Sequence, residues 1–376
     1  MMSKPLDGVR IIELAGIGPG PYAGQLLADM GAEIIVINRP GPMGGVPNLS
    51  NRGKKSLTLD LRKPEGAAIV LDLVKSADVL FEGLRPGVTE RLGVGPEACH
   101  VVNPKLVYGR MTGWGQSGPW AKVAGHDINY ISITGALAAM GTVDTPPSPP
   151  LNLVGDYGGG SLFLVAGILA GLFQAERTGK GEIVDAAIID GTNSMMSILH
   201  MLSSLGRWSP ERGTNILDGA WPFYRCYATQ DGKFMAVGPL EPQFFAEMLR
   251  LLEIDVQDYG EQRDISKFPE QHAMLEAKFA SKTRDAWAKI FDGTEACVTP
   301  VLTYEEAPDH PQNAARGGLR KQGPFVHPRP APGFKDMETD PDFTVPGPND
   351  DAADVFAELG YDTAKLEALK AAGVIS

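Results

Sequence analysis

Residues 9–38 read VRIIELAGIGPGPYAGQLLADMGAEIIVIN and contain the pattern that decides the fold. An apolar strand at 9–15 leads into a glycine-rich turn at 16–21, a helix closed by Gly31 follows, and a second apolar strand spans 33–38. Strand, turn, helix and strand form a βαβ unit of the nucleotide-binding type. The sequence therefore predicts an α/β fold with a Rossmann-like sheet.

The turn departs from the dinucleotide-binding pattern GxGxxG. Its three glycines alternate, and Pro19 and Pro21 remove two backbone N–H donors that would otherwise bind a pyrophosphate. The second strand is followed by Arg39, where an NAD-binding fold would place a carboxylate. An arginine suits a phosphate on the ribose, although a solvated surface arginine is an equal alternative.

Cations gather in two further stretches of the chain. Residues 51–63, NRGKKSLTLDLRK, carry five cations in a chain of net charge -12, which indicates either an anionic ligand or a solvated loop. The strand at 77–82 leaves through a loop with two further arginines, at the edge where open α/β sheets bind ligands. The arginines that could converge there on one polyphosphate are Arg39, Arg62, Arg85 and Arg91.

The stretch GHDINY at 125–130 places a histidine beside an aspartate where a helical apolar pattern begins. Asp127 is a suitable N-cap, so His126 would project from the positive end of the helix, a place to move a proton near developing negative charge. The plainer alternative is that Asp127 only caps the helix and that His126 is a surface residue.

Two more carboxylates precede predicted helices. Asp156 stands before three glycines, which would let a substrate approach it closely, and Glu241 stands before Pro242. For either residue, a favourable charge at a helix start is the alternative explanation.

Composition narrows the class of protein. A chain of 376 residues, 43% hydrophobic and 21% charged, predicts two domains with a sizeable core. The acidic balance, with a pI near 5.0, argues against nucleic acid and anionic membranes as partners. Three distant cysteines without CxxC argue against a disulfide scaffold or a metal site. The longest apolar run, 162–173, is too short to span a bilayer, and with no signal-type segment we expect a cytoplasmic protein.

The predicted domains are a large one, 1–204 with 325–376, and a small α+β one with linkers, 205–324. A hairpin signal at 230–232 lies inside the small domain, and the proline-rich stretch 323–348 is predicted to be an irregular return linker.

The ordered set of motifs resembles the family III CoA-transferase superfamily, and within it the members that racemise 2-methylacyl-CoA thioesters. Each motif alone is a weak signal, whereas the ordered set is specific and covers nearly all of the chain, weakening after about Leu302. The motifs are VRIIEL at 9–14, RPGV at 85–88, TGWGQ at 112–116, the segment around His126, Asp156 with its glycines, VDAA at 184–187 and EPQF at 241–244.

The resemblance implies an interlocked homodimer, in which the large domain of one subunit faces the small domain of the other. It implies that His126 and Asp156 are the acid/base pair and that Glu241 is the partner of the histidine. It further implies that CoA contacts Arg39, Leu59, Asp60, Leu61, Arg62, Gly83, Leu84, Arg85, Arg91, Gly125, Asp127, Ile128, Asn129 and Tyr130.

The chemistry of that assignment is coherent. Racemisation removes a weakly acidic α-proton from one face of the acyl group and returns a proton to the other, which two opposed bases can do. One base must be protonated while the other is not, and a histidine and an aspartate in different environments meet this condition. Backbone N–H groups near Asp127 would stabilise the enolate oxygen. The reaction needs no metal or redox cofactor, since CoA is part of the substrate.

Three alternatives differ in the chemistry they require. A family III CoA-transferase would use Asp156 as a nucleophile that forms an acyl anhydride and moves CoA between carboxylic acids. Those relatives commonly carry Gly-Tyr-Asp where this chain has Gly-His-Asp at 125–127, so His126 favours proton transfer. The broken glycine pattern disfavours an NAD(P)-dependent oxidoreductase. A non-catalytic acyl-CoA-binding protein would not need His126, Asp156 and Glu241 together.

Overall fold

The computed structural model describes residues 4–41, 48–335 and 343–375. Contacts within the chain divide it into two compact units. The large unit consists of residues 1–136, 150–197 and 317–376, and the small unit consists of residues 137–149 and 198–316.

This division differs from the predicted domain boundaries in three places. Residues 137–149 and 198–204 lie in the small unit, and residues 317–324 lie in the large unit. The first difference arises because the proline-rich connector that follows η2 has no regular structure and gave no sign of which unit it packs against.

The large unit is built on a six-stranded parallel sheet in the order β3-β2-β1-β4-β5-β6, which confirms the predicted Rossmann-like α/β fold. Isoleucine, valine and leucine dominate β1 and β2 because both faces of such a sheet are covered. The strands are β1 (Arg10–Leu14), β2 (Glu33–Asn38), β3 (Lys55–Thr58), β4 (Val79–Glu82), β5 (Val107–Thr112) and β6 (Ile183–Ala187).

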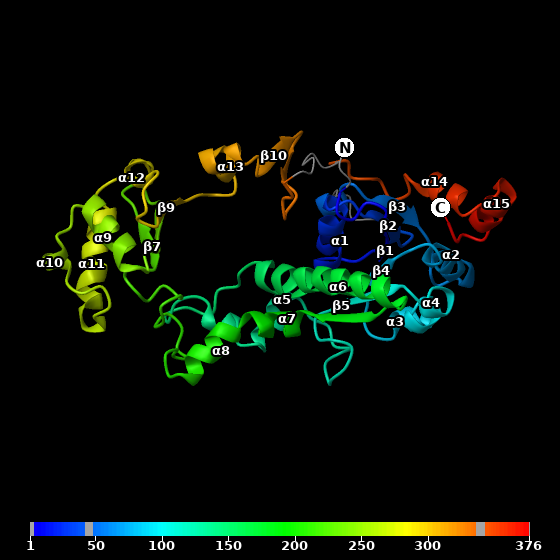
Figure 1. Cartoon of the computed structure of the whole chain (residues 1–376), viewed down its shortest axis with the longest axis horizontal. Coiled ribbons are helices and arrows are strands. Elements are labelled where there is room, and N and C mark those ends of the chain that lie inside the picture. The colour runs from blue at the N-terminus through cyan, green and yellow to red at the C-terminus, as the bar shows by residue number, and fades with distance from the viewer. Residues whose placement is uncertain (1–3, 42–47, 336–342, 376) are drawn as a thin grey trace. The chain divides into compact units, whose positions relative to one another are not determined.

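Alternate residues of one strand enter opposite layers of the core, as the pleat of a strand requires. Ile11 packs with helices α1 (Pro19–Asp29) and α6 (Leu162–Thr178) on one face. Ile12 packs on the other face with α2 (Pro64–Val74), α4 (Pro96–Val102), α14 (Ala352–Glu358) and α15 (Thr363–Ala371). Figure 1 shows the red carboxyl-terminal helices beside the blue amino-terminal strands, so both ends of the chain complete this unit.

The large unit has further elements besides this sheet and the helices that cover it. Beyond β6 the chain continues directly into α7. These further elements are η1 (Leu49–Asn51), α3 (Val88–Arg91), α5 (Asp127–Ser132), η3 (Leu153–Ser161), α7 (Ile188–Met195), β10 (Leu319–Gln322) and β11 (Phe325–Pro328).

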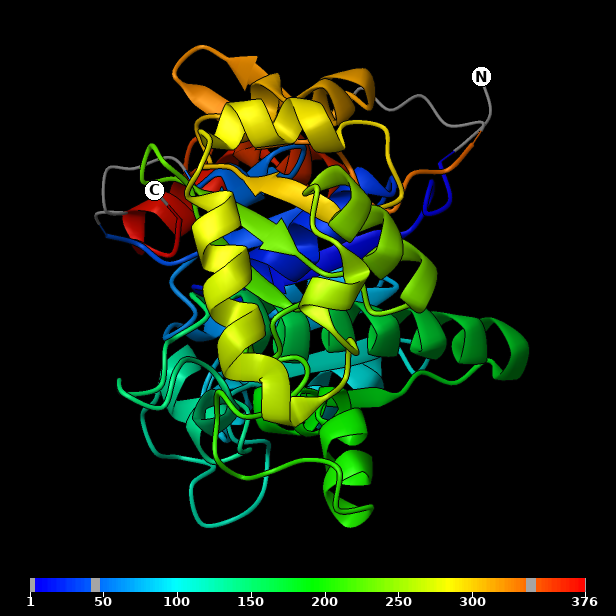
Figure 2. The same ribbon diagram turned by 90° about the vertical axis from the view of Figure 1, so that its left-hand side faces the viewer.

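The small unit has its own three-stranded antiparallel sheet and core. Strands β7 (Arg225–Ala228) and β8 (Phe234–Val237) form the predicted hairpin, and β9 (Val298–Val301) pairs with β8. Helices α11 and α12 pack against this sheet around Trp287 (Figures 1 and 2). Its other elements are η2 (Leu137–Ala139), α8 (Ser197–Ser204), α9 (Pro242–Leu251), α10 (Val256–Tyr259), η4 (Ile265–Lys267), α11 (Phe268–Phe279), α12 (Arg284–Phe291), η5 (Ala307–Asp309) and α13 (Pro311–Ala315).

The prediction of an irregular linker over 323–348 was partly wrong. Strands β10 and β11 form an antiparallel hairpin, and Gly323 takes a positive φ of 57° in the turn between them. The proline content of the segment concealed this hairpin. Residues 336–342 of the predicted linker lie outside the described residues.

The helix that covers the sheet is longer than its apolar run suggested. η3 and α6 form one continuous helix, Leu153–Thr178, which by length and composition alone is apolar enough to cross a membrane. Its inner side, including Leu164 and Ile168, is buried against the sheet. Its outer side exposes apolar side chains, among them Leu162 and Phe173, so this helix is hydrophobic on most of its surface.

Two cations of the basic stretch 51–63 are structural, a role that neither a ligand-binding loop nor a solvated loop would give them. Arg52 forms a buried ion pair with Asp29 at 2.6 Å, and Lys54 forms one with Glu13 at 2.7 Å. The Lys54 ammonium also donates to the carbonyl of Pro21, in the first turn of α1. These pairs connect the loop before β3 to β1 and α1, a long-range contact that charge counting cannot reveal.

Replacing Lys54 by methionine should destabilise the large unit, because the Glu13 carboxyl would stay buried without a partner. We expect the free energy of unfolding, measured by urea denaturation, to fall by about 3–5 kcal/mol. The double variant Glu13→Leu/Lys54→Met should recover most of this loss. A single variant as stable as the wild type would contradict the structural role of the pair.

Candidate active site

The candidate site lies beyond the carboxyl ends of the parallel strands. The loop after β1 holds Gly18, the loop after β4 holds Arg85, and the long connection after β5 leads to α5, which begins beside His126. Helix α5 also contacts η3, the segment that carries Asp156. Because the strands are parallel, these segments meet at one edge of the sheet, where such folds bind ligands.

Asp156 lies inside a π-helix, and not before the start of a helix as the sequence suggested. A π-helix is rare and occurs frequently at functional sites. The side chain is partly buried and lies against the glycine-rich turn, where a Cβ added to Gly18 would be 2.9 Å from Oδ2. Burial, and next the charge of Asp127, raise the pKa of Asp156 to about 6, and the charge of His126 opposes them. This carboxyl can therefore exchange a proton near neutral pH.

Asp127 does not cap α5, which corrects the prediction. His126 is the N-cap residue, and its backbone N–H donates to the side-chain oxygen of Asn129 at 3.0 Å. Asp127 occupies the first helical position, and its carboxylate instead accepts the backbone N–H of Asp156 at 2.7 Å. The aspartate thus connects α5 to η3, across a sequence distance that no capping rule covers.

His126 is exposed, and its position at the start of α5 brings its charge within reach of Asp156. Glu241 lies in the small unit, where it is the N-cap residue of α9, and Pro242 occupies the first turn as predicted. The structure therefore brings His126 and Asp156 together in one unit and places Glu241 in the other.

Tyr130 is enclosed by the glycines of the predicted motifs. A Cβ added to Gly113 would lie 2.0 Å from its ring, and one added to Gly125 would lie 2.7 Å from it, so both positions require glycine. The hydroxyl of Tyr130 donates to the carbonyl of Gly125. Trp114 packs edge-on against the Tyr130 ring, with the two ring centroids 4.8 Å apart. Burial raises the pKa of Tyr130, Asp156 raises it further and the Arg85 cation lowers it.

The residues predicted to contact CoA differ in how exposed they are and in whether they already have an ion-pair partner. Leu59 and Asp60 are buried, Leu61 and Leu84 are partly buried, and Gly83 is exposed. Arg62 is paired with Asp60 at 2.8 Å and would have to exchange this partner to bind a phosphate. The side chains that are exposed are Arg39, Arg62, Arg85, Arg91, Ile128 and Asn129.

A buried ion pair that the sequence did not reveal orders the loop with Arg85. Arg110 of β5 lies beside its register partner Glu82 of β4, with Nε 3.0 Å from the carboxylate, and also pairs with Glu90 at 2.8 Å. Glu82 accepts the backbone N–H of Leu84 at 2.6 Å. Burial raises the pKa of Glu82 to about 7. Opposite charges at the ends of two consecutive strands were the signal that could have revealed this pair.

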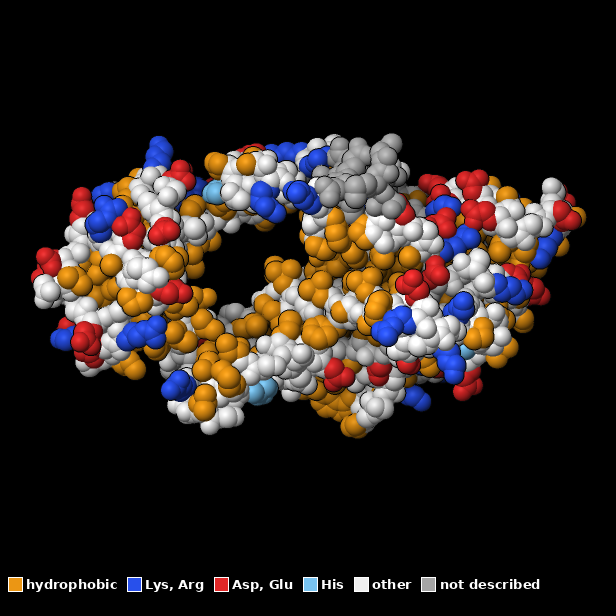
Figure 3. All heavy atoms as spheres, viewed as in Figure 1, with side chains coloured by type: hydrophobic (Ala, Val, Ile, Leu, Met, Phe, Trp, Pro, Cys, Tyr) orange, Lys and Arg blue, Asp and Glu red, His pale blue; other side chains and the backbone are white. Residues whose placement is uncertain are grey.

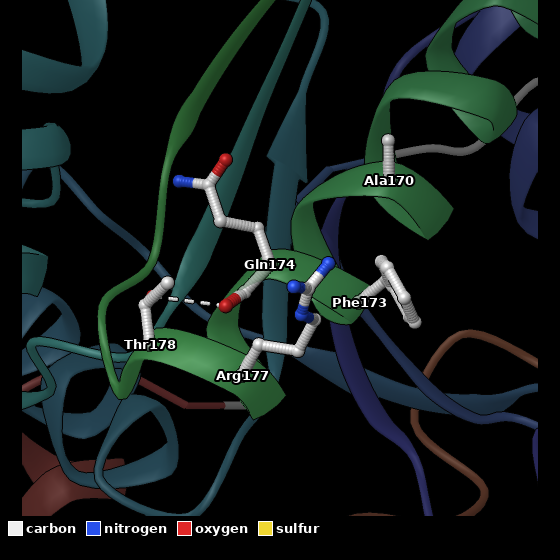
Figure 4. A pocket seen from close by; sticks show the side chains of 5 residues that line it. All are labelled: Ala170, Phe173, Gln174, Arg177 and Thr178. Carbon is white, nitrogen blue, oxygen red and sulfur yellow. Dashed lines mark hydrogen bonds between the residues drawn. The ribbon is translucent and has the colours of Figure 1, made fainter.

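An open concavity along α6 carries no group suited to proton transfer. Ala170, Phe173, Gln174, Arg177 and Thr178 line it (Figure 4), and the Arg177 guanidinium lies 5.3 Å from the centre of the Phe173 ring. These residues belong to the second half of α6, whereas Asp156 precedes the helix. Among residues 4–41, 48–335 and 343–375, no group of three or more metal-ligating side chains is found.

Comparison with known proteins identifies the class to which this site belongs. Residues 6–351 match the family described as CoA-transferase family III, and the chain belongs to this family. A CaiB/BaiF family protein from Brucella suis has a similar structure, with a TM-score of 0.79 and 28% identity over 95% of this chain and 100% of that one.

Within the family, the chain is similar to two curated racemases. It is 46% identical to alpha-methylacyl-CoA racemase of Mus musculus over 87% of this chain and 86% of the relative. It is 41% identical to alpha-methylacyl-CoA racemase of Homo sapiens over 98% of this chain and 97% of the relative.

The raised pKa of Asp156 predicts a measurable effect on stability. Between its usual pKa of 3.8 and about 6 the folded state holds a proton that the unfolded state has lost, so stability decreases as pH rises through this range. Asp156→Asn removes the ionised group and should raise the melting temperature above pH 6, with the difference disappearing below pH 4. A melting temperature lowered equally at all pH values would contradict the assigned cause.

Proposed function

We propose that this protein racemises 2-methylacyl-CoA thioesters by transferring the α-proton between His126 and Asp156 through an enolate. The observation that carries the proposal is the partly buried Asp156 carboxyl, whose pKa is raised to about 6, within electrostatic reach of His126. Such a carboxyl can donate and accept protons near neutral pH, as a two-base reaction requires. The two racemases among the relatives support the substrate class.

Each base would serve one face of the enolate. The base that removes the proton must be unprotonated and the opposite base protonated, and their roles reverse in the other direction. Backbone N–H groups in the first turn of α5 would stabilise the enolate oxygen, and removing one such donor typically costs about 2.7–4 kcal/mol in the barrier. In this proposal Glu241 orients the His126 ring.

The CoA moiety would bind along the carboxyl edge of the sheet. Exposed Arg85 and Arg91 follow β4, and Arg39 follows β2, so cations come from two strands of the same edge. Guanidinium groups bind phosphates through paired hydrogen bonds. Because CoA belongs to the substrate, the proposed reaction uses no separate cofactor.

We also propose that the protein is a homodimer. Figure 3 shows hydrophobic side chains gathered over α6, and the large unit exposes Leu162, Phe163, Phe173 and Met195. A second copy of the chain would remove this apolar area from water. With Glu241 supplied by one of the subunits, the site would be completed in the assembly.

The nearest alternative, transfer of CoA through an Asp156 anhydride, is less well supported. His126 would have no role in that reaction comparable to proton transfer.

The variants His126→Ala and Asp156→Ala should each lose racemisation by about a hundredfold or more, because each removes one of the two bases. The measurement is epimerisation and deuterium incorporation at the α-position of a single 2-methylacyl-CoA epimer in deuterated water. His310→Asn, which replaces one N-cap by another outside the site, is the matched control. Full activity of either alanine variant would exclude the two-base mechanism, and CoA transfer to an added carboxylic acid without exchange would favour the transferase.

Arg85→Ala and Arg91→Ala should raise KM for the acyl-CoA roughly tenfold each while leaving kcat nearly unchanged, because each removes a charge-assisted contact to phosphate. The effect should shrink as salt concentration rises. Lys75→Ala, which removes an exposed cation directly after α2, is the control. An unchanged KM in both arginine variants would place the CoA elsewhere.

A further inference from the structure

Asp127 contacts the backbone of the segment that carries Asp156. One carboxylate oxygen, Oδ2, accepts the N–H of Asp156 at 2.7 Å. A Cβ added to Gly155 would lie 2.4 Å from the same oxygen, so the carboxylate can approach this closely because residue 155 is glycine. Helix α5 and the π-helix η3 are in contact at this point.

The second oxygen of Asp127 has a different environment. Oδ1 is buried and has no hydrogen-bond partner among the described residues. Burial raises the pKa of Asp127, and the backbone N–H groups of Asp156 and Gly155 oppose this change, so within the described residues backbone donors stabilise its charge. A charge held in this way keeps its effect on a neighbouring carboxyl, because little solvent screens it.

We propose that Asp127 is a positioning residue for Asp156: it fixes the π-helical turn that carries Asp156 and holds a second negative charge beside it. The inference depends on the proposed function only in assigning Asp156 the transfer of a proton. The fixed turn aims the Asp156 carboxyl, and the nearby charge makes its proton harder to lose. Asp156 can then return a proton to an enolate near neutral pH.

Titratable groups lie on or beside the elements that pack against η3. His126 directly precedes α5, which carries Asp127 and Tyr130, while α1 and α7 carry Tyr22 and Asp190. Burial is the main cause of the raised pKa of Asp156, Asp127 is the second, and His126 acts in the opposite direction. Asp127 is thus the charged side chain that favours the protonated form.

The test uses the full-length protein and two substitutions that separate charge from hydrogen bonding. Asp127→Asn keeps an oxygen that can accept the N–H of Asp156 but removes the charge, whereas Asp127→Ala removes both. The pKa of Asp156 is measured by ¹³C NMR of labelled aspartate, with its signal assigned from the Asp156→Asn spectrum. Hydrogen exchange of the amides at positions 155 and 156 reports on the turn.

In Asp127→Asn we expect the pKa of Asp156 to fall by about one pH unit and the acidic limb of the kcat/KM profile to move down with it. In Asp127→Ala we expect the same change and, in addition, faster exchange of the two amides and a lower kcat. Asp78→Asn is the matched control, since Asp78 accepts the N–H of Arg10 at 2.8 Å before the start of β4.

An unchanged or higher pKa of Asp156 in Asp127→Asn would overturn the electrostatic role, and unchanged amide exchange in Asp127→Ala would overturn the structural one. Neither the titration nor the exchange requires a substrate. They remain decisive if the racemase assay fails, so failure of this inference and failure of the proposed function are distinguishable.

Discussion

The parallel alignment of β1, β4 and β5 is the constraint on which the candidate site depends. It brings the ends of three strands to one edge of the sheet, so that segments far apart in the chain can contact one another. The Asp127 carboxylate then reaches the backbone of Asp156, and the Asp156 carboxyl reaches the turn at Gly18. Without the alignment, none of these contacts would form.

The periodic and turn-forming parts of the fold were predictable from sequence, because their causes are local. The βαβ unit, the hairpin of the small unit and the start of α9 at Pro242 all follow from apolar patterns and turn residues. The family resemblance added His126, Asp156 and Glu241 as site residues. What could not be predicted depends on contacts between distant segments. The cations of residues 52 and 54 proved to be buried partners of Asp29 and Glu13, and Asp127 proved to bind η3 and not to cap α5.

Buried carboxyl groups near the carboxyl edge of the sheet share one property. Burial is the largest cause that raises the pKa of Glu13, Glu82 and Asp156, and a cation opposes it in each case. For Glu13 and Glu82 that cation is a fixed lysine or arginine at hydrogen-bond distance. For Asp156 it is the exposed His126, which leaves this carboxyl free to respond to a substrate. The same physical effect thus stabilises the scaffold in two places and prepares a reactive group in the third.

The π-helix that precedes α6 sets the direction of Asp156 relative to the face of α6 that packs on the sheet. A helix with i→i+5 hydrogen bonds accommodates more residues in each turn than an α-helix, so residues before Leu162 are rotated out of the register that α6 would impose. The face of α6 that packs on the sheet and the face of η3 that carries Asp156 can therefore change separately during evolution. Related chains could keep the same core helix and aim a different side chain at the substrate by inserting or deleting a single residue in this segment.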